Sequence, residues 1–203
     1  MDTATTTERA LAAFQAAGGM LRSCELFRQG IHPSKLYELV ETGRVTRLAR
    51  GLYRLESAEE CSYPDLAMVA AKSTDVVVCL VSALAFHEIT TQIPRVVQLA
   101  VPRGHYAGLR LTFPPVSVYR FDAATFEEGI ESHSIEAARI RVFSVARTLV
   151  DCFKYRNKIG LDVAVEALRF ARSRFNVSNR EILHFARRLR QERVMGPYLE
   201  AIP

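Results

Sequence analysis

Apolar residues recur at helical spacing in three short segments near the start of the chain, and a glycine follows each segment. The three expected helices cover residues 7–17, 24–29 and 33–42. Two short expected strands, 45–48 and 52–55, then flank the turn Ala49-Arg50-Gly51. Three helices followed by a two-stranded ribbon predict a winged helix-turn-helix at this end of the chain.

A polar and acidic stretch, residues 56–63, separates this segment from the rest and predicts a domain boundary. We therefore expect a DNA-binding domain at 1–58 and a second domain at 59–203. The second part has strand-like runs in its middle and helical periodicity at its end. The predicted fold class is α+β, with the winged helix-turn-helix followed by a mixed α/β domain that ends in helices.

Within the second part, two predictions concern particular elements. The strand-like runs 109–113 and 116–121 are separated by a Pro-Pro pair, and we expect them to form a hairpin. Ser144 and Ser178 are expected to cap helices, and the helix after Ser178 is expected to cover 179–193 as one element.

The composition is that of a globular protein that buries a core, since 49% of the 203 residues are hydrophobic and 24% are charged. No apolar run approaches the roughly 18 residues that a membrane span needs. Glu8, Arg9 and Gln15 interrupt the alanine-rich start. A signal peptide is therefore not expected, and the predicted location is the cytoplasm, with no membrane partner.

The net charge of +5 is distributed unevenly. Residues 143–203 carry 12 basic and 6 acidic side chains, a net charge of +6, whereas residues 1–60 carry 8 of each. Within 20–55, however, 7 basic side chains face 3 acidic ones, a net charge of +4. This local excess favours a polyanion as the partner of the N-terminal segment.

Residues 30–55 combine a presentable helix with a basic hairpin, the two elements that a reader of double-stranded DNA needs. With the leucines of the helix facing the core, its outer face presents four candidate DNA contacts: His32, Ser34, Lys35 and Tyr37. The hairpin adds four candidate phosphate contacts: Arg44, Arg47, Arg50 and Arg54. The plainer alternative is that all of these are ordinary solvated side chains.

Two acidic residues of the second part have apolar neighbours on both sides. Asp151 lies four residues after Arg147 on an expected helix, which is within pairing distance. A buried carboxylate needs such a partner, so we favour a structural ion pair over an active site. Glu166 invites the same interpretation, with Arg169 or Lys154 as its partner.

Motifs for catalysis and metal binding are incomplete. His87-Glu88 begins an HExxH pattern, but Thr91 stands where the second histidine would be. Asp65 and Asp75 could join Glu88 in a metal-dependent nuclease, but no Glu-x-Lys or Asp-x-Lys pair accompanies them. The cysteines are far apart and form no CxxC pair: Cys24, Cys61, Cys79 and Cys152. We expect reduced, mostly buried thiols, no metal, no cofactor and no enzyme activity.

Arginines crowd the C-terminal helices and permit two interpretations. One is a surface that docks an acidic partner or a second stretch of DNA, and the other is an ordinary solvated helix face. The candidate residues for the first are Arg172, Arg174, Arg180, Arg187, Arg188 and Arg190.

Three long stretches carry a family resemblance: CLVSALAFHEITTQIP at 79–94, ARTLVDCFKYRNKIGLDVAVEALR at 146–169, and GRVTRLARGLYRL at 43–55. The first two resemble the AbiEi family, whose members are antitoxins of type IV toxin–antitoxin systems in bacteria and their phage-defence islands. The third looks like that family's N-terminal winged helix. The resemblance covers about residues 5–195.

This resemblance implies a winged helix that represses transcription and a C-terminal domain with the antitoxin effect. It implies binding to an inverted-repeat operator in double-stranded DNA, repression of the protein's own operon, and opposition to a nucleotidyltransferase-like toxin. The alternatives are a transcriptional regulator without antitoxin activity and a metal-dependent nuclease. The expected assembly is a monomer or weak homodimer, binding DNA cooperatively if two copies meet on the operator.

Overall fold

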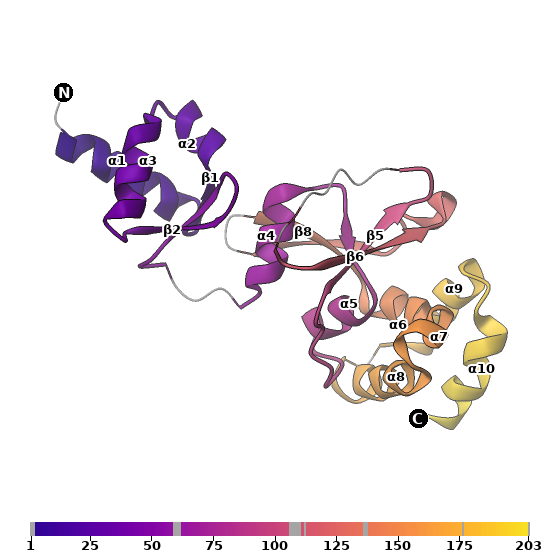
Figure 1. Cartoon of the computed structure of the whole chain (residues 1–203). Coiled ribbons are helices and arrows are strands. Elements are labelled where there is room, and N and C mark those ends of the chain that lie inside the picture. Colours follow the sequence, from indigo (N-terminus) through magenta and orange to yellow (C-terminus); the bar gives the residue numbers. More distant parts are fainter. Residues whose placement is uncertain are drawn as a thin grey trace. The chain divides into compact units, whose positions relative to one another are not determined.

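The computed structural model describes residues 3–58, 62–105, 111, 113–135, 138–175 and 177–202 (Figure 1). By internal contacts the chain divides into two compact units. Unit 1 comprises Met1–Thr74, Leu109–Pro114 and His133–Ile140, and unit 2 comprises Asp75–Gly108, Pro115–Ser132 and Arg141–Pro203. Ten α-helices and two sheets in the described residues make a mixed α/β fold. The domain boundary near residue 58 stays a prediction.

Short helices and strands alternate at the start of unit 1. In chain order they are α1 (Thr3–Ala16), β1 (Met20–Arg22), α2 (Ser23–Arg28), α3 (Pro33–Glu41), β2 (Val45–Ala49), β3 (Leu52–Leu55) and α4 (Pro64–Lys72). The strands form an antiparallel sheet in the order β1-β3-β2. The three helices and the hairpin expected from the sequence are present, and β1 adds a third strand.

One apolar cluster joins the helices of this segment. Phe14 of α1, Leu26 of α2, and Leu36 and Leu39 of α3 are each at most 1% exposed. Each such side chain contributes about 1.5–3 kcal/mol on burial. Because residues three and four apart share a helix face, burial of the two α3 leucines fixes which face of α3 can reach solvent.

A five-stranded mixed sheet has the order β6-β5-β4-β8-β7. Its strands are β4 (Val77–Val78), β5 (Val97–Pro102), β6 (Val116–Phe121), β7 (Ile130–Ile135) and β8 (Ala138–Phe143), with a short 3-10 helix, η1 (Ala123–Thr125), after β6. Strand β5 pairs antiparallel with β4 and parallel with β6, while β4 pairs parallel with β8.

The predicted hairpin between 109–113 and 116–121 is wrong. Strand β6 lies parallel to β5 instead, with Val116 opposite Val97 and Phe121 opposite Pro102. Leu111 and Phe113 lie in no strand, and the rest of the first predicted run falls outside the described residues. Parallel pairing requires a long crossover connection, and alternation within a run says nothing about which strand becomes its neighbour.

One helix, α5 (Leu80–Phe86), lies between β4 and β5. After β8 the chain is helical, as expected, with α6 (Val145–Lys154), α7 (Arg156–Ile159), α8 (Leu161–Phe175), α9 (Asn179–Arg188) and α10 (Glu192–Ala201). The predicted caps are present, since the hydroxyls of Ser144 and Ser178 accept backbone N–H groups at 3.4 and 3.2 Å. The prediction of a single helix over 179–193 is wrong at its C-terminal end, because α9 ends at Arg188. Arg190 has a φ of 59°, and this left-handed residue separates α9 from α10.

Gly129 lies where unit 2 leaves no room for a side chain. Its φ is +72°, and a Cβ there would lie 2.8 Å from Cζ of Phe185 and 3.0 Å from Cβ of Arg147. We expect Gly129→Ala to lower the free energy of unfolding by about 2–4 kcal/mol, through backbone strain and overpacking. Gly104→Ala is the matched control for urea denaturation, because its φ is +81° but no described atom lies within 4 Å of the new Cβ. Equal losses in the two variants would contradict a packing contribution at Gly129.

Candidate nucleic-acid interface

The first turn of α3 faces solvent and is ordered by its own side chains. His32 is the N-cap residue, and its Nδ1 accepts the backbone N–H of Ser34 at 3.3 Å. The hydroxyl of Ser34 lies 2.8 Å from the same nitrogen. Pro33 fits the first helical position because its missing N–H would have no intrahelical partner there. Two of the predicted DNA-contacting side chains, His32 and Ser34, are thus exposed and held in place.

The expectation that Lys35 lies on the outer face of α3 is wrong. Its side chain is only 7% exposed, and its Nζ pairs with Oε2 of Glu38 at 2.7 Å. Its position lets the aliphatic stem pack inward while the ammonium reaches a carboxylate one turn along the helix. Tyr37, by contrast, is 58% exposed. The surface of α3 therefore offers His32, Ser34 and Tyr37, with the charge of Lys35 already paired.

Three exposed arginines lie along the β2–β3 hairpin and its first flank. Arg44, Arg47 and Arg50 are exposed, whereas Arg54 is half-buried in the central strand of the sheet. Gly51 supplies the φ of +73° that the turn requires. A bulge follows Arg47, so strict alternation of side chains fails there. Arg47 and Arg50 lie toward the turn, whereas Arg44 precedes β2 at the opposite end of the hairpin and Arg54 lies opposite Thr46.

Two hydrogen bonds from outside the hairpin hold its turn. The backbone N–H of Ser23, at the start of α2, donates to the carbonyl of Gly51 at 3.0 Å. The ammonium of Lys72, in the last turn of α4, donates to the carbonyl of Arg50. Sequence reasoning missed both residues, because a serine and a lysine at helix ends are too common to be informative.

Comparison with protein families matches the segment that contains this arrangement. Residues 8–55 match the family described as "Transcriptional regulator, AbiEi antitoxin". The match covers 48 of the 203 residues. It includes α3 and the whole hairpin, so the resemblance expected from residues 43–55 is confirmed. A search of curated proteins found no match to the chain. AbiEi is a family of regulatory antitoxins rather than of enzymes.

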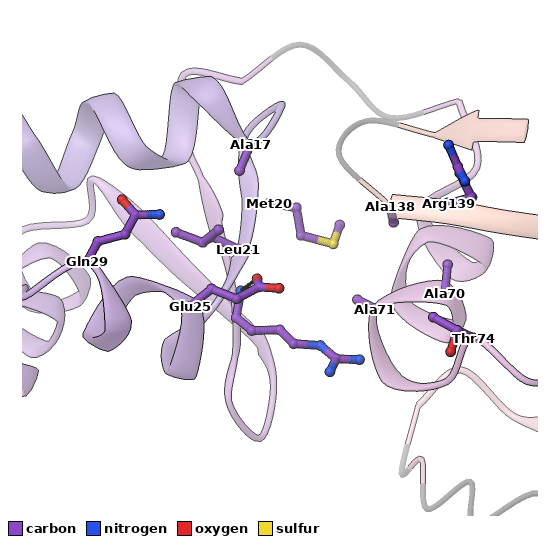
Figure 2. Close-up of a pocket in the computed structure, with 11 residues that line it drawn as sticks. Ala17, Met20, Leu21, Glu25, Gln29, Ala70, Ala71, Thr74, Ala138 and Arg139 are labelled. Carbon is purple, nitrogen blue, oxygen red and sulfur yellow. Dashed lines mark hydrogen bonds between the residues drawn. The ribbon is translucent and has the colours of Figure 1, made fainter.

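A hollow of about 480 Å³ lies in unit 1 beside the AbiEi segment (Figure 2). Met20 of β1 and Glu25 of α2 line it together with Ala70 and Ala71 of α4. The carboxylate of Glu25 accepts the backbone N–H of Arg22 at 3.1 Å and so caps α2. The alanine-rich walls supply shape but no set of converging catalytic groups.

Beyond the AbiEi segment, Arg147 and Asp151 form the ion pair that the sequence predicts. Nε donates to Oδ2 at 2.8 Å, and both side chains are at most 1% exposed. Nη1 donates to the carbonyls of Thr125 and Glu128 at 2.8 and 3.0 Å. The guanidinium also lies 4.7 Å from the ring centre of Phe143. These contacts join α6 to the chain around η1, which is a structural role.

Burial raises the pKa of Asp151 from 3.8 to about 6, and the charge and hydrogen bond of Arg147 limit the rise. Between these values the folded protein retains a proton that the unfolded chain has released. The contribution of Asp151 to stability is therefore complete below pH about 4 and is lost as the pH rises through about 6, at about 1.4 kcal/mol per pKa unit. Urea unfolding at several pH values should show this slope in the native protein and not in Asp151→Asn. Identical slopes would contradict it.

Arg172 and Arg174 are engaged within the fold. From α8, Arg172 donates to the carbonyl of Ile202, just after α10, and to Oδ1 of Asn179 at the start of α9. Carbonyls at helix ends lack intrahelical partners, so this arginine satisfies groups that would otherwise need water. Arg174 places its guanidinium 5.0 Å from the ring centre of Phe170.

The other arginines of the predicted basic surface divide into two classes. Ion pairs join Arg187 to Glu192 at 2.8 Å and Arg188 to Glu128. The exposed members without an ion-pair partner among the described residues are Arg180 and Arg190. Carboxylates thus pair with two of the six arginines, and neutral groups of the fold hold Arg172 and Arg174.

Threonines satisfy Glu166, in place of the arginine or lysine expected from the sequence. Its Oε1 accepts the backbone N–H of Thr91 at 2.8 Å and the hydroxyl of Thr90 at 3.0 Å. The backbone bond from Thr91 is the main cause that lowers the pKa of Glu166. The carboxylate therefore fastens the loop after α5 to α8.

No group of three His, Cys, Asp or Glu side chains in the described part of the chain could hold a metal ion. Cys79 and Cys152 are buried, and burial raises the pKa of both thiols well above its usual value. Cys24 is exposed, and Cys61 lies outside the described residues. Among the helices described, none has the length and apolar content to cross a membrane.

Proposed function

We propose that the protein is a DNA-binding transcriptional repressor of its own operon and the antitoxin of a type IV toxin–antitoxin system. The AbiEi match at residues 8–55 carries this proposal, because the matched segment contains the exposed start of α3 and the arginine hairpin. The positive charge in this segment suits a DNA partner.

In this proposal the first elements of unit 1 act as a winged helix-turn-helix. The start of α3 enters the major groove, where His32, Ser34 and Tyr37 contact base edges. Each good base contact discriminates against a wrong base by about 1–3 kcal/mol. The three exposed arginines of the hairpin bind phosphates and fix the register of α3 on the duplex. The alternative, that these side chains are only solvated, predicts no preference among DNA sequences.

An inverted-repeat operator would receive one copy of the chain on each half-site. Half-sites separated by about one helical turn, roughly 34 Å, would place two copies on one face of the duplex. Bound there, they would block transcription of the operon. The C-terminal part of the chain would then counter a nucleotidyltransferase-like toxin encoded beside it.

A gel-shift titration tests DNA reading. The probe is the duplex immediately upstream of the protein's own gene, and the control is a scrambled duplex of the same length at the same salt. We expect the upstream duplex to bind at least about a thousandfold more tightly, the lower end of specific recognition. Equal affinity for the two duplexes would contradict a specific operator.

Co-expression tests the antitoxin role. The neighbouring gene is induced with and without the full chain, and growth is followed. We expect the neighbour to arrest growth and the chain to relieve the arrest, even when Arg47→Glu and Arg50→Glu remove DNA binding. A harmless neighbour would leave a transcriptional regulator without antitoxin activity.

A further inference from the structure

Four cationic side chains, from β1, β2, the turn and α4 of unit 1, lie around the tip of the hairpin. Arg47 belongs to β2 and Arg50 to the turn itself. Arg22 ends β1 directly opposite Leu52, the first residue after the turn, and neighbouring strands lie about 4.8 Å apart. Lys72 reaches the same turn from α4, through its bond to the carbonyl of Arg50.

In the part of the chain that the structure describes, no ion pair joins a carboxylate to any of these four side chains. Burial and then the charges of Arg22, Arg50 and Arg47 lower the pKa of Lys72. Glu25 lies three residues after Arg22, and its carboxylate is used to cap α2. Like charges kept close by the fold repel one another in the free protein, so an anion that enters between them is favoured.

We propose that Arg22, Arg47, Arg50 and Lys72 form one phosphate-binding site for the DNA backbone, so that the DNA-binding surface continues past the AbiEi segment to the end of α4. This inference rests on the proposed function, and it adds Arg22 to the predicted phosphate contacts together with Lys72, which lies beyond the family match at 8–55. Arginine forks bind phosphate oxygens bidentately, and the lysine adds a point charge behind them.

Salt dependence separates a phosphate contact from a purely structural role of Lys72. A lysine that only anchors the turn would change affinity without changing the number of counterions released. A phosphate contact contributes about 0.9 to the slope of log affinity against log salt. At 0.1 M salt, loss of one such contact corresponds to about an eightfold loss of affinity, since the slope applies over one decade of salt below 1 M.

The experiment titrates the full-length protein on the upstream duplex between 0.05 and roughly 0.3 M salt, a range in which such slopes are measurable. We expect Lys72→Gln and Arg22→Gln each to reduce the slope by about 0.9. Each should lower the affinity for the scrambled duplex by the same factor as the affinity for the upstream duplex. Lys72→Arg should retain the native slope. Arg9→Gln is the matched control, since Arg9 is an exposed arginine of α1 that bonds the carbonyl of Gln29.

The outcomes distinguish the two proposals. If the native protein shows no salt-dependent DNA binding, the proposed function itself fails. If Arg47→Gln lowers the slope while Lys72→Gln and Arg22→Gln leave it unchanged, the four-residue site is overturned and DNA binding survives. If Lys72→Gln lowers the affinity but keeps the native slope, Lys72 only holds the turn in place, and the four-residue site is also overturned. Thermal unfolding of each variant establishes that it is folded.

Discussion

Replacement of Arg147 by methionine is expected to lower the free energy of unfolding by about 3–5 kcal/mol. The change leaves the carboxylate of Asp151 buried without its cation. It also removes the donor to the carbonyls of Thr125 and Glu128, and each buried acceptor that loses its partner costs about 1–3 kcal/mol. Urea denaturation of the full chain measures the loss. It would be among the largest effects of any single substitution, because a domain is stable by only about 5–15 kcal/mol.

Two further variants separate the ion pair from general sensitivity to mutation. Arg180→Met removes an exposed arginine of α9 and should change the free energy of unfolding by less than about 0.5 kcal/mol. Adding Asp151→Leu to Arg147→Met removes the orphaned carboxylate, so the double variant should be more stable than the sum of the two single losses predicts, by about 0.5–3 kcal/mol. Strictly additive losses would mean that the two side chains do not stabilise each other.

Reversal of charge at Arg47 and Arg50 is expected to reduce affinity for the upstream duplex by about a hundredfold or more at 0.1 M salt. Loss of two phosphate contacts accounts for about sixtyfold, since each contributes about 0.9 to the salt slope, and the added glutamates repel the backbone. Both arginines are exposed, so substitution should leave the fold intact. Fluorescence anisotropy over a salt series measures affinity and slope together.

The control for the Arg47 and Arg50 double variant changes the net charge by the same amount, at two arginines far from the hairpin in the sequence. Arg95→Glu with Arg103→Glu alters two exposed arginines of unit 2 and should lower affinity only severalfold, through the long-range field. Equal losses in the two double variants would show that total charge governs binding and that the hairpin has no special part in it.

Features that depend on neighbours within one turn of helix could be predicted from the sequence. Leu36 and Leu39 define the inner face of α3 by spacing alone. Ser178 could be identified as a cap because it directly precedes an amphipathic run. Arg147 and Asp151 stand one helical turn apart, so their pairing follows from helix geometry once both are buried.

Features that depend on residues far apart in the chain could not be predicted. The bond from Lys72 to Arg50 spans 22 residues, and that from Thr91 to Glu166 spans 75. Parallel pairing of β5 with β6 likewise leaves no mark within either strand. The prediction that Lys35 is exposed was wrong for a different reason. Its position lies at the edge of the buried face, where the length of a lysine lets the aliphatic stem turn inward.

The bond from Ser23 to Gly51 links the tip of the hairpin to the start of α2, and so links both to the helix that follows. We expect this bond to order the hairpin in the free protein. If the protein binds DNA as proposed, association with a duplex should require no slow rearrangement after collision, and the observed rate should rise linearly with protein concentration. Differences in the duplex sequence should then change mainly the residence time of the protein on the duplex, and its association rate much less.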